Sequence, residues 1–328
     1  MEDLRQRKKI LGMNQYEFNI FMRKYGIGFV MIGMIILLAI VSPTFRTTGN
    51  VISILLQVSI NGLIALGMVW AITTGGIDLS VGSILALGSV VIGAILDVSN
   101  GNILLACLTA IIASVVFGFV NGFLIARYEM IPFVVTLATQ LVIRGVAYII
   151  SGGYSQSLAN ANFKQIGNGN LFGIIPYPVV ILIVVAVIAY ILMHWTRFGR
   201  YVYAVGGNIH AATASGVNIF WTRVSAYIIS ALFTGIASII MTSRISAAQP
   251  NIGIGYETDA IAACVIGGTS FSGGVATIPG TFMGIIIIGL IYNGMNLVGI
   301  NSYWQTITKG LLIIGAIALD MAMNKRKK

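Results

Sequence analysis

The sequence predicts an all-α integral membrane protein with about ten transmembrane helices. Of its 328 residues, 57% are hydrophobic and only 9% are charged, whereas a water-exposed surface needs roughly 25–35% charged residues. Apolar runs near the ~20-residue length that crosses a bilayer recur along the whole chain. The 39 glycines suit close helix packing in lipid. This composition excludes a cytosolic enzyme, a disordered chain and a secreted disulfide scaffold.

Ten segments have the length and polarity of membrane crossings. The first lacks a small-residue cleavage site, so it is an uncleaved span. The eighth is short and ends in a run of glycine and serine, so we expect a broken or re-entrant element there. In chain order, the segments are residues 26–43, 50–73, 80–97, 103–125, 132–150, 177–195, 222–243, 257–272, 277–298 and 303–322.

Charge distribution predicts the orientation of these segments. With both ends inside, 14 basic residues are cytoplasmic and 3 are outside, as the positive-inside rule requires. Residues 1–25 then form a cytoplasmic segment, 26–322 the transmembrane domain and 323–328 a cytoplasmic basic tail. The net charge of +10 is explained by the basic residues that set the orientation of the spans. The sequence has no folded basic domain that would suggest nucleic-acid binding.

The sequence contains no pattern for a catalytic centre. Walker A, HExxH and GxSxG motifs are absent, as is a cluster of Cys and His ligands. Cys107 and Cys264 lie within apolar runs and are expected to be buried side chains. We therefore predict a protein that is not an enzyme and that has no metal or cofactor of its own.

The predicted cytoplasmic loop 196–221 is a candidate docking segment. Asn208 can cap a short helix over 208–215, and Gly216 can end it. Such a helix could be gripped by a partner protein, although an ordinary inter-helix loop is equally consistent with the composition. The candidate docking residues are Arg197, Gly199, Arg200, Gly206, Gly207, Asn208, Ala211, Ala212, Ser215 and Gly216.

Two glycine-rich stretches predict broken helices, near 75–82 and near 267–279. In the first, Asp78 and Ser80 can cap the following helix, which offers a structural explanation for an acid within the membrane. A role in transport is the alternative, because intramembrane acids are often functional. Similar breaks in two halves of a chain are typical of a transport pathway. Gly118 with Gly122, and Gly280 with Gly284, predict close helix packing.

Polar residues gather in two further sets. We expect an outer cluster suited to polyhydroxyl ligands, in which Lys309 pairs with Asp259 or Glu257, although interfacial anchoring alone explains its aromatic members. Its members are Tyr256, Glu257, Asp259, Tyr303, Trp304, Gln305 and Lys309. Polar residues within spans are candidates for a hydrophilic passage, namely Gln57, Asn61, Asp78, Ser80, Asn121, Gln140, Asn293 and Asn296.

Four motifs together resemble the permease subunits of bacterial ATP-binding-cassette sugar importers, in particular the ribose permease branch. They are GGIDLSVGS at 75–83, TRFGRYVYAVGGN at 196–208 with SGVN at 215–218, SAAQPNIGIGYETDAIAACVIGGTSFSGG at 246–274 and NSYWQTITKG at 301–310. The likeness covers about residues 40–322. Ile77 and Val81 follow the ribose branch, whereas Phe271 and Trp304 look like the galactoside branch, so the sugar stays open.

The resemblance implies a multi-pass protein of the bacterial cytoplasmic membrane that forms a homodimer. It also implies two cytoplasmic ATPase domains, which hold ATP and Mg, and an extracytoplasmic sugar-binding protein. The 196–221 loop would be the coupling segment that docks the ATPase. The alternative is an ion-coupled secondary transporter of a small polar solute, which would not need a partner-gripping loop.

Overall fold

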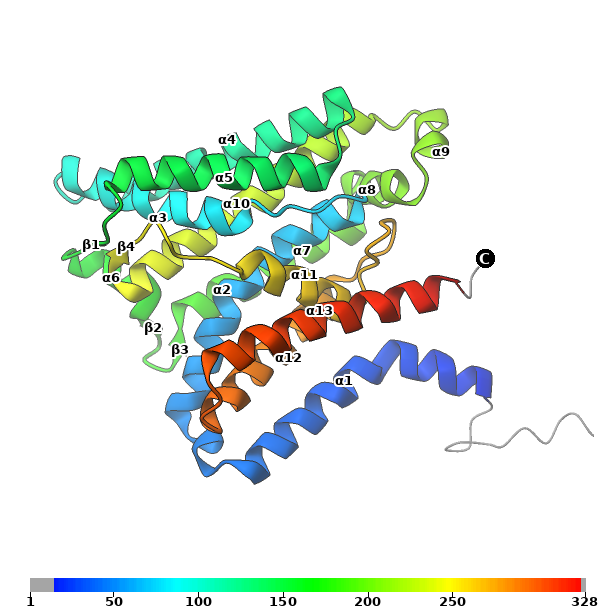
Figure 1. Ribbon diagram of the computed structural model, residues 1–328, viewed down its shortest axis with the longest axis horizontal. Coiled ribbons are helices and arrows are strands. Elements are labelled where there is room, and N and C mark those ends of the chain that lie inside the picture. The colour runs from blue at the N-terminus through cyan, green and yellow to red at the C-terminus, as the bar shows by residue number, and fades with distance from the viewer. Residues whose placement is uncertain (1–14, 326–328) are drawn as a thin grey trace, which may run out of the picture.

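The computed structural model describes residues 15–325 and is built almost wholly of helices (Figure 1). The helices are α1 (Gln15–Val41), α2 (Thr48–Thr73), α3 (Val81–Val98), α4 (Ile103–Tyr128), α5 (Pro132–Ser151), α6 (Ala161–Asn168), α7 (Tyr177–Trp195), α8 (Arg197–Gly207), α9 (Ile209–Ala214), α10 (Ile219–Ile245), α11 (Tyr256–Ile266), α12 (Ile278–Leu297) and α13 (Ser302–Lys325). A 3₁₀ turn, Pro43–Arg46, joins α1 to α2. The predicted N-terminal segment up to residue 14 and the tail from residue 326 lie outside the described residues.

Two pairs of very short antiparallel strands complete the fold. β1 (Gln156–Ser157) pairs with β4 (Ala247–Ala248), and Gln156 lies opposite Ala248. β2 (Asn170–Leu171) pairs with β3 (Ile175–Pro176) in a tight hairpin. These strands and α6 lie within the two segments that link α5 to α7 and α10 to α11.

Seven of the described helices are individually long and apolar enough to cross a membrane, which confirms a multi-pass α-helical membrane protein. They are α2, α3, α4, α5, α7, α10 and α12. The apolar part of α1 is shorter, at Gly26–Val41, and α1 and α13 run along the same bundle in Figure 1.

The eighth predicted crossing is only half helical. α11 has 11 residues, which span about 16 Å, or half of a bilayer core. Gln249 and a series of turns over residues 250–255 precede it, and residues 267–277 follow it as a loop. The predicted span at 257–272 therefore extended too far, because left-handed backbone at Gly268 follows the end of the helix at Ile266. The predicted break near 267–279 is present.

α2 and α10 occupy the centre of the bundle, where Leu63, Ile64 and Trp70 of α2 are fully buried. α4 packs against α10 along the predicted Gly118–Gly122 face. A Cβ atom added to Gly122 would lie 2.7 Å from the Cα atom of Val224, so only glycine allows this approach. The periodic small residues therefore predicted a helix contact correctly.

Helix starts are set by local capping. The side-chain oxygen of Asn102 accepts a hydrogen bond from the amide of Leu105 at the start of α4. Asn218 caps α10 in the same way through the amide of Trp221. Such caps satisfy amides that have no partner within the helix.

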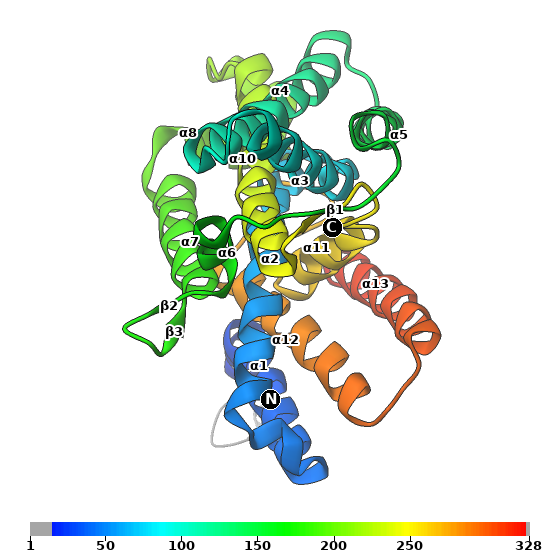
Figure 2. The same cartoon turned by 90° about the vertical axis from the view of Figure 1, so that its left-hand side faces the viewer.

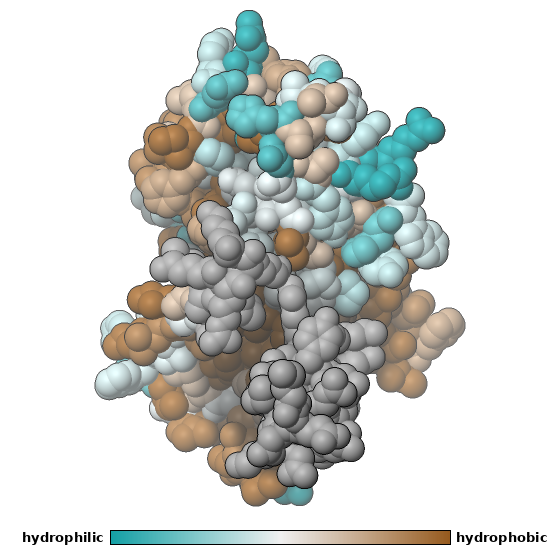
Figure 3. All heavy atoms as spheres, turned by 90° about the vertical axis from the view of Figure 1, so that its right-hand side faces the viewer, coloured by the Kyte–Doolittle hydropathy of each residue, from teal (hydrophilic) through white to brown (hydrophobic). Residues whose placement is uncertain are grey.

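The two ends of the bundle differ in what they carry. The start of α1, the end of α13 and helices α8 and α9 lie at one end, at the right of Figure 1, which we call the α8–α9 end. The opposite end holds α6, β1 and β4 and is called the α6 end. Figure 3 faces the α8–α9 end and shows hydrophilic side chains gathered on its upper half, with hydrophobic ones along the flanks.

Candidate functional site

The predicted docking segment folds as two consecutive helices. Thr196 caps α8 through the amide of Gly199, at 3.2 Å. Asn208 ends α8 and caps α9, because its side-chain oxygen accepts from the amide of Ala211 at 3.0 Å. Gly216, at φ +78°, ends the segment. The Asn208 cap and the Gly216 stop are thus confirmed.

α8 itself was missed by the sequence analysis, which proposed only a short helix over 208–215. Gly206 and Gly207 lie in the last turn of α8. The eleven-residue helix is amphipathic, with Gly199, Val202 and Val205 buried. The three-residue spacing of Gly199, Val202 and Val205 was the signal that could have predicted it.

α9 presents a different face from the expected one. Ala211, Ala214 and Ser215 are exposed, whereas Ala212 is only 3% exposed and packs into the protein. Ala212 is therefore not available for docking, contrary to the prediction. Arg197 and Arg200 are exposed on α8. The surface open to a partner consists of these arginines and the outer face of α9.

Three separate segments meet beside α8 at a set of glycines that we call the glycine junction: Gly75, Gly206, Gly207, Gly273 and Gly274. The amide of Gly274 donates to the carbonyl of Thr73 at 2.9 Å. A Cβ atom on Gly206 would overlap that same carbonyl and lie 2.5 Å from the Gly274 nitrogen. α8 thus contacts both the end of α2 and the loop after α11 with no intervening side chain.

Two aromatic side chains strengthen this attachment. Phe198 of α8 stacks on Trp70 of α2, with ring centroids 5.5 Å apart. The hydroxyl of Tyr203 donates to the carbonyl of Ala276 at 3.1 Å, and burial raises the pKa of Tyr203, which keeps this donor protonated. A displacement of α8 would therefore be passed to both neighbouring segments.

The break between α2 and α3 is held by a buried polar cluster. The two carboxylate oxygens of Asp78 accept hydrogen bonds from the backbone and hydroxyl of Ser80 and from the hydroxyl of Ser230 on α10. Asn121 of α4 donates to the Ser80 hydroxyl at 2.8 Å. Asp78 and Ser80 therefore tie three elements together, and the Ser80 side chain does not cap α3 as predicted. Ser230 was missed because one serine in an apolar helix is not distinctive.

A second polar cluster surrounds the start of α11. The ammonium of Lys309 lies 2.8 Å from a carboxylate oxygen of Asp259, which confirms the predicted ion pair. Tyr292 of α12 donates to the same oxygen, at 2.8 Å. Lys309 also donates to the carbonyl of Gly255 at 3.0 Å. Glu257 accepts from the Gly255 amide rather than pairing with Lys309.

The structure divides the predicted outer cluster into two sets. Tyr256, Glu257 and Asp259 lie at the start of α11, and Lys309 reaches them from α13. Tyr303 and Trp304 are exposed at the start of α13, where Gln305 donates to Asn296 at 2.7 Å. The prediction merged them because residues two turns apart on α13 are close in sequence but differ in depth.

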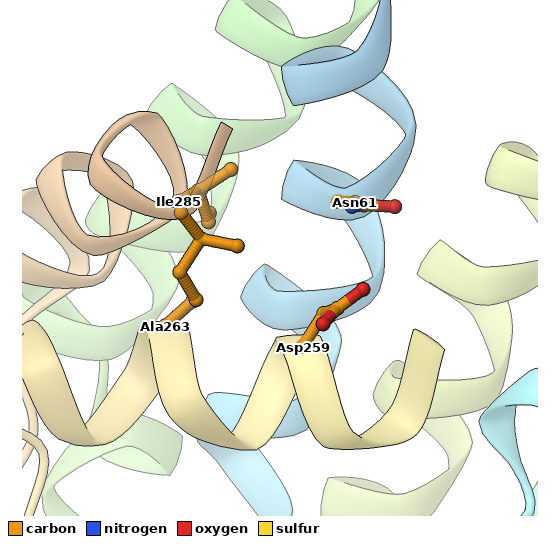
Figure 4. A pocket seen from close by; sticks show the side chains of 5 residues that line it. Asn61, Asp259, Ala263 and Ile285 are labelled. Carbon is orange, nitrogen blue, oxygen red and sulfur yellow. The ribbon is translucent and has the colours of Figure 1, made fainter. Parts of the chain in front are cut away.

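The remaining passage candidates have varied environments. Asn293 exchanges two hydrogen bonds with Asn50, at 2.7 and 3.1 Å, and so joins α12 to α2. Asn61 lines a narrow crevice with Asp259, Ala263, Ile285 and Ile288 (Figure 4). Gln57 and Gln140 are half-buried. The structure does not gather these residues into one site.

Neither cluster resembles a metal centre. Among the residues that the structure describes, no three His, Cys, Asp or Glu side chains could hold an ion together. Cys107 and Cys264 are both free thiols.

Comparison with known proteins gives a consistent result. Residues 50–317 match the family described as branched-chain amino acid transport system / permease component. The ribose import permease protein RbsC of Bacillus subtilis is 42% identical over 92% of this chain and 94% of its own length. The D-allose permease AlsC of Escherichia coli is 37% identical, covering 94% and 95% of the two chains. The L-arabinose permease AraH of E. coli is 34% identical, covering 96% and 95%. No solved structure matches significantly.

Proposed function

The chain belongs to the family of branched-chain amino acid transport system permease components. From its similarity to the ribose permease of Bacillus subtilis, we propose that it is the ribose permease of an ATP-driven importer. It is a membrane-spanning transport subunit of the sugar-importing kind and is not itself catalytic. ATP hydrolysis belongs to a separate ATPase, and delivery of the sugar belongs to a binding protein.

Ribose is the cargo supported best by the relatives. Identity is 42% to the ribose permease, against 37% to the allose permease and 34% to the arabinose permease. Because these differences are modest, the cargo has to be measured. Sugar uptake by an ATPase-driven system does not depend on an ion gradient, which separates it from a secondary transporter.

The glycine junction is the observation that carries the energy-coupling part of this proposal. We propose that the ATPase binds the exposed face of α9 and the arginines of α8, and that closing of the ATPase displaces α8. Since Gly206 contacts both Thr73 and Gly274 directly, the displacement reaches the end of α2 and the loop before α12. These two segments adjoin the broken parts of the bundle, where the backbone is least constrained by helical hydrogen bonds.

Orientation and assembly follow from charge and symmetry. We propose that the α8–α9 end faces the cytoplasm, since Arg127, Arg197, Arg200 and Arg223 lie at or beside it. Two copies of the chain would enclose the sugar passage at their seam, as two-fold symmetric transport assemblies do. The binding protein would then dock at the α6 end. Transport arises because the ATP-bound state favours one of two conformations.

The cargo is tested by uptake in proteoliposomes that contain the chain with the ATPase and binding protein encoded beside it. We expect ATP-dependent accumulation of labelled ribose that persists when a protonophore dissipates the proton gradient. A binding-protein-free preparation is the control. Accumulation of allose or arabinose in preference to ribose would overturn the cargo, and uptake abolished by the protonophore at constant ATP would overturn the energy source.

A further inference from the structure

The stretch from Gln249 to Gly255 is non-helical chain placed inside the bundle, and the proposed function does not yet explain it. It begins at the α6 end, directly after β4, and leads to α11. Figure 1 shows it as a thin coil that passes from β4 toward the middle of the molecule. We call residues 249–255 the extended segment.

Contacts with α3 define how deep the extended segment goes. The amide of Gln249 donates to the Ser89 hydroxyl at 3.2 Å, and a Cβ atom on Gly253 would lie 2.7 Å from the Gly82 carbonyl oxygen. Between Ser89 and Gly82 the segment therefore descends two turns of α3, about 10 Å. Gly82 lies in the first turn of α3, beside the buried Asp78 cluster. The extended segment thus lies alongside α3, one of the helices that are long and apolar enough to cross a membrane.

Charged side chains replace the hydrogen bonds that a helix would have supplied. Arg144 of α5 donates from one nitrogen to the carbonyls of Pro250 and Ile252, each at 2.8 Å. Lys309 of α13 donates to the carbonyl of Gly255, and Glu257 accepts from the Gly255 amide. Cations from two helices therefore fix the extended segment from both sides.

One side of the extended segment is uncovered. Asn251 is exposed and Ile254 is 69% exposed. Figure 2 looks along the bundle from the α6 end and places this part of the chain at the margin of the molecule, between α5 and α13. Irregular backbone is not tolerated against lipid, and at membrane depth it is buried in protein or lines a water-filled cavity.

A hollow at the α6 end leads toward the same place. It has a volume of about 350 Å³ and is lined by residues of α3, α5 and β1 and by Ala248 of β4, which directly precedes the extended segment. Asp97, Ser151 and Gln156 give this hollow polar walls. Water and a sugar entering from this end would meet the extended segment next.

We propose that the exposed side of the extended segment is a wall of the aqueous sugar passage, with Arg144 as the residue that positions it. This inference rests on the proposed function for the identity of the cargo. The Asn251 amide and exposed main-chain groups offer both donors and acceptors to sugar hydroxyls. Gln140, one turn before Arg144 on α5, adds a second amide on the same helix face.

Access of water to Ile254 distinguishes a passage wall from a lipid-facing surface. The experiment uses the full chain, assembled with its ATPase and binding protein in proteoliposomes, in which Cys107→Ala and Cys264→Ala remove the native thiols. Ile254→Cys is compared with Ile112→Cys, because Ile112 is an equally apolar side chain, 60% exposed, within α4. The probe is a charged, membrane-impermeant methanethiosulfonate, and the bond formed is a mixed disulfide with release of sulfinate.

We expect Ile254→Cys to react at least about tenfold faster than Ile112→Cys, because a charged reagent does not enter hydrocarbon. Modification should also block sugar uptake by Ile254→Cys and leave uptake by Ile112→Cys unchanged. Equal, slow reaction at both positions would overturn the proposal, even if ribose uptake is normal. Rapid reaction at Ile254→Cys in a protein that carries another sugar would support the passage wall and overturn only the ribose assignment.

The positioning role of Arg144 has its own readout. Arg144→Met removes both hydrogen bonds from Arg144 to the extended segment, so we expect the reaction rate at Ile254→Cys to change by about tenfold while that at Ile112→Cys is unaffected. Arg144→Lys, which retains a cation, should restore the original rate in part. An unchanged rate in Arg144→Met protein that folds normally would show that Arg144 does not position the segment.

Discussion

At the scale of single residues, the proposed coupling between α8 and α2 requires that Gly206 has no side chain. A methyl group at this position would overlap the carbonyl of Thr73, which already accepts a hydrogen bond from Gly274. At Gly207 an added Cβ atom meets nothing within 4 Å. Two adjacent glycines of one helix therefore have very different tolerance for a side chain.

Gly206→Ala should separate α8 from the end of α2. Overpacking against backbone costs about 1–3 kcal/mol, so we expect a lower unfolding temperature in detergent and weaker stimulation of the ATPase by loaded binding protein. Gly207→Ala is the matched control and should behave as the wild type. Equal behaviour of the two variants would show that the junction is not closely packed.

Lys309 and Asp259 form an ion pair whose energetic coupling can be measured. Their side chains are 23% and 6% exposed, so the loss of one partner leaves a charge in a poorly solvated place. Breaking a fully buried pair costs ~3–5 kcal/mol, and partial exposure reduces that cost. We expect Lys309→Met to lower stability more than the double change Lys309→Met with Asp259→Asn.

The measurement is a double-mutant cycle of unfolding in detergent, which isolates the pairwise energy. Tyr292→Phe serves as the control, because it removes the hydrogen bond from an uncharged donor to Asp259 and leaves the ion pair intact. If the loss of stability in the double variant equalled the sum of the losses in the two single variants, the ion pair would make no pairwise contribution to stability.

At the scale of elements, α9 has an outer face that is open to a partner and an inner face that packs into the fold. Its six residues expose Ala214 and bury Ala212. A glutamate at position 212 would bury an unpaired charge and disturb the fold. A glutamate at position 214 would project outward, where only a partner could be affected.

Ala214→Glu should therefore be expressed and folded at normal levels but fail to retain the ATPase during purification, and uptake should fall to background. Ala214→Ser is the control for a small polar change at the same position. Ala212→Glu is expected to reduce the yield of folded protein instead. Normal uptake by Ala214→Glu would reject α9 as the docking element.

At the scale of the whole molecule, the breaks in the helices connect its two ends. The glycine junction lies at the α8–α9 end, and α11 connects its loop to Gly255, the last residue of the extended segment. The ion pair with Lys309 and the Arg144 contacts hold that segment in place. A movement applied at α8 thus has a continuous packed route to the proposed passage wall.

The proposal that the α6 end faces outward and the α8–α9 end faces the cytoplasm can be tested in whole cells. In the chain without native cysteines, Asn162→Cys on α6 should react with an impermeant maleimide added outside, whereas Ala214→Cys on α9 should react only after the cells are opened. Both residues are exposed in the folded chain, so reactivity reports the side of the membrane. Reaction of both from outside would contradict cytoplasmic placement of the α8–α9 end.

Local signals in the sequence predicted the features that depend on neighbouring residues. Asn208 and Gly216 predicted the limits of α9, because capping needs only the residues at a helix end. Gly118 and Gly122 predicted a close contact, because small residues at this spacing share one helix face. Lys309 was predicted to pair with Asp259 or Glu257, because unpaired charges are costly within a membrane, and the structure shows the pair with Asp259.

The sequence by itself thus determined the fold class, the charge asymmetry and the family of this protein. It predicted ten crossings, whereas seven of the described helices are long and apolar enough to cross a membrane. Only the tertiary structure decided that Ala212 faces inward, that Arg144 caps carbonyls of the extended segment, and that Gly206 contacts Thr73. In soluble proteins an apolar face indicates burial, but in lipid both the core and the surface are apolar. Which face of a helix meets protein is therefore decided by contacts between segments that are far apart in the chain.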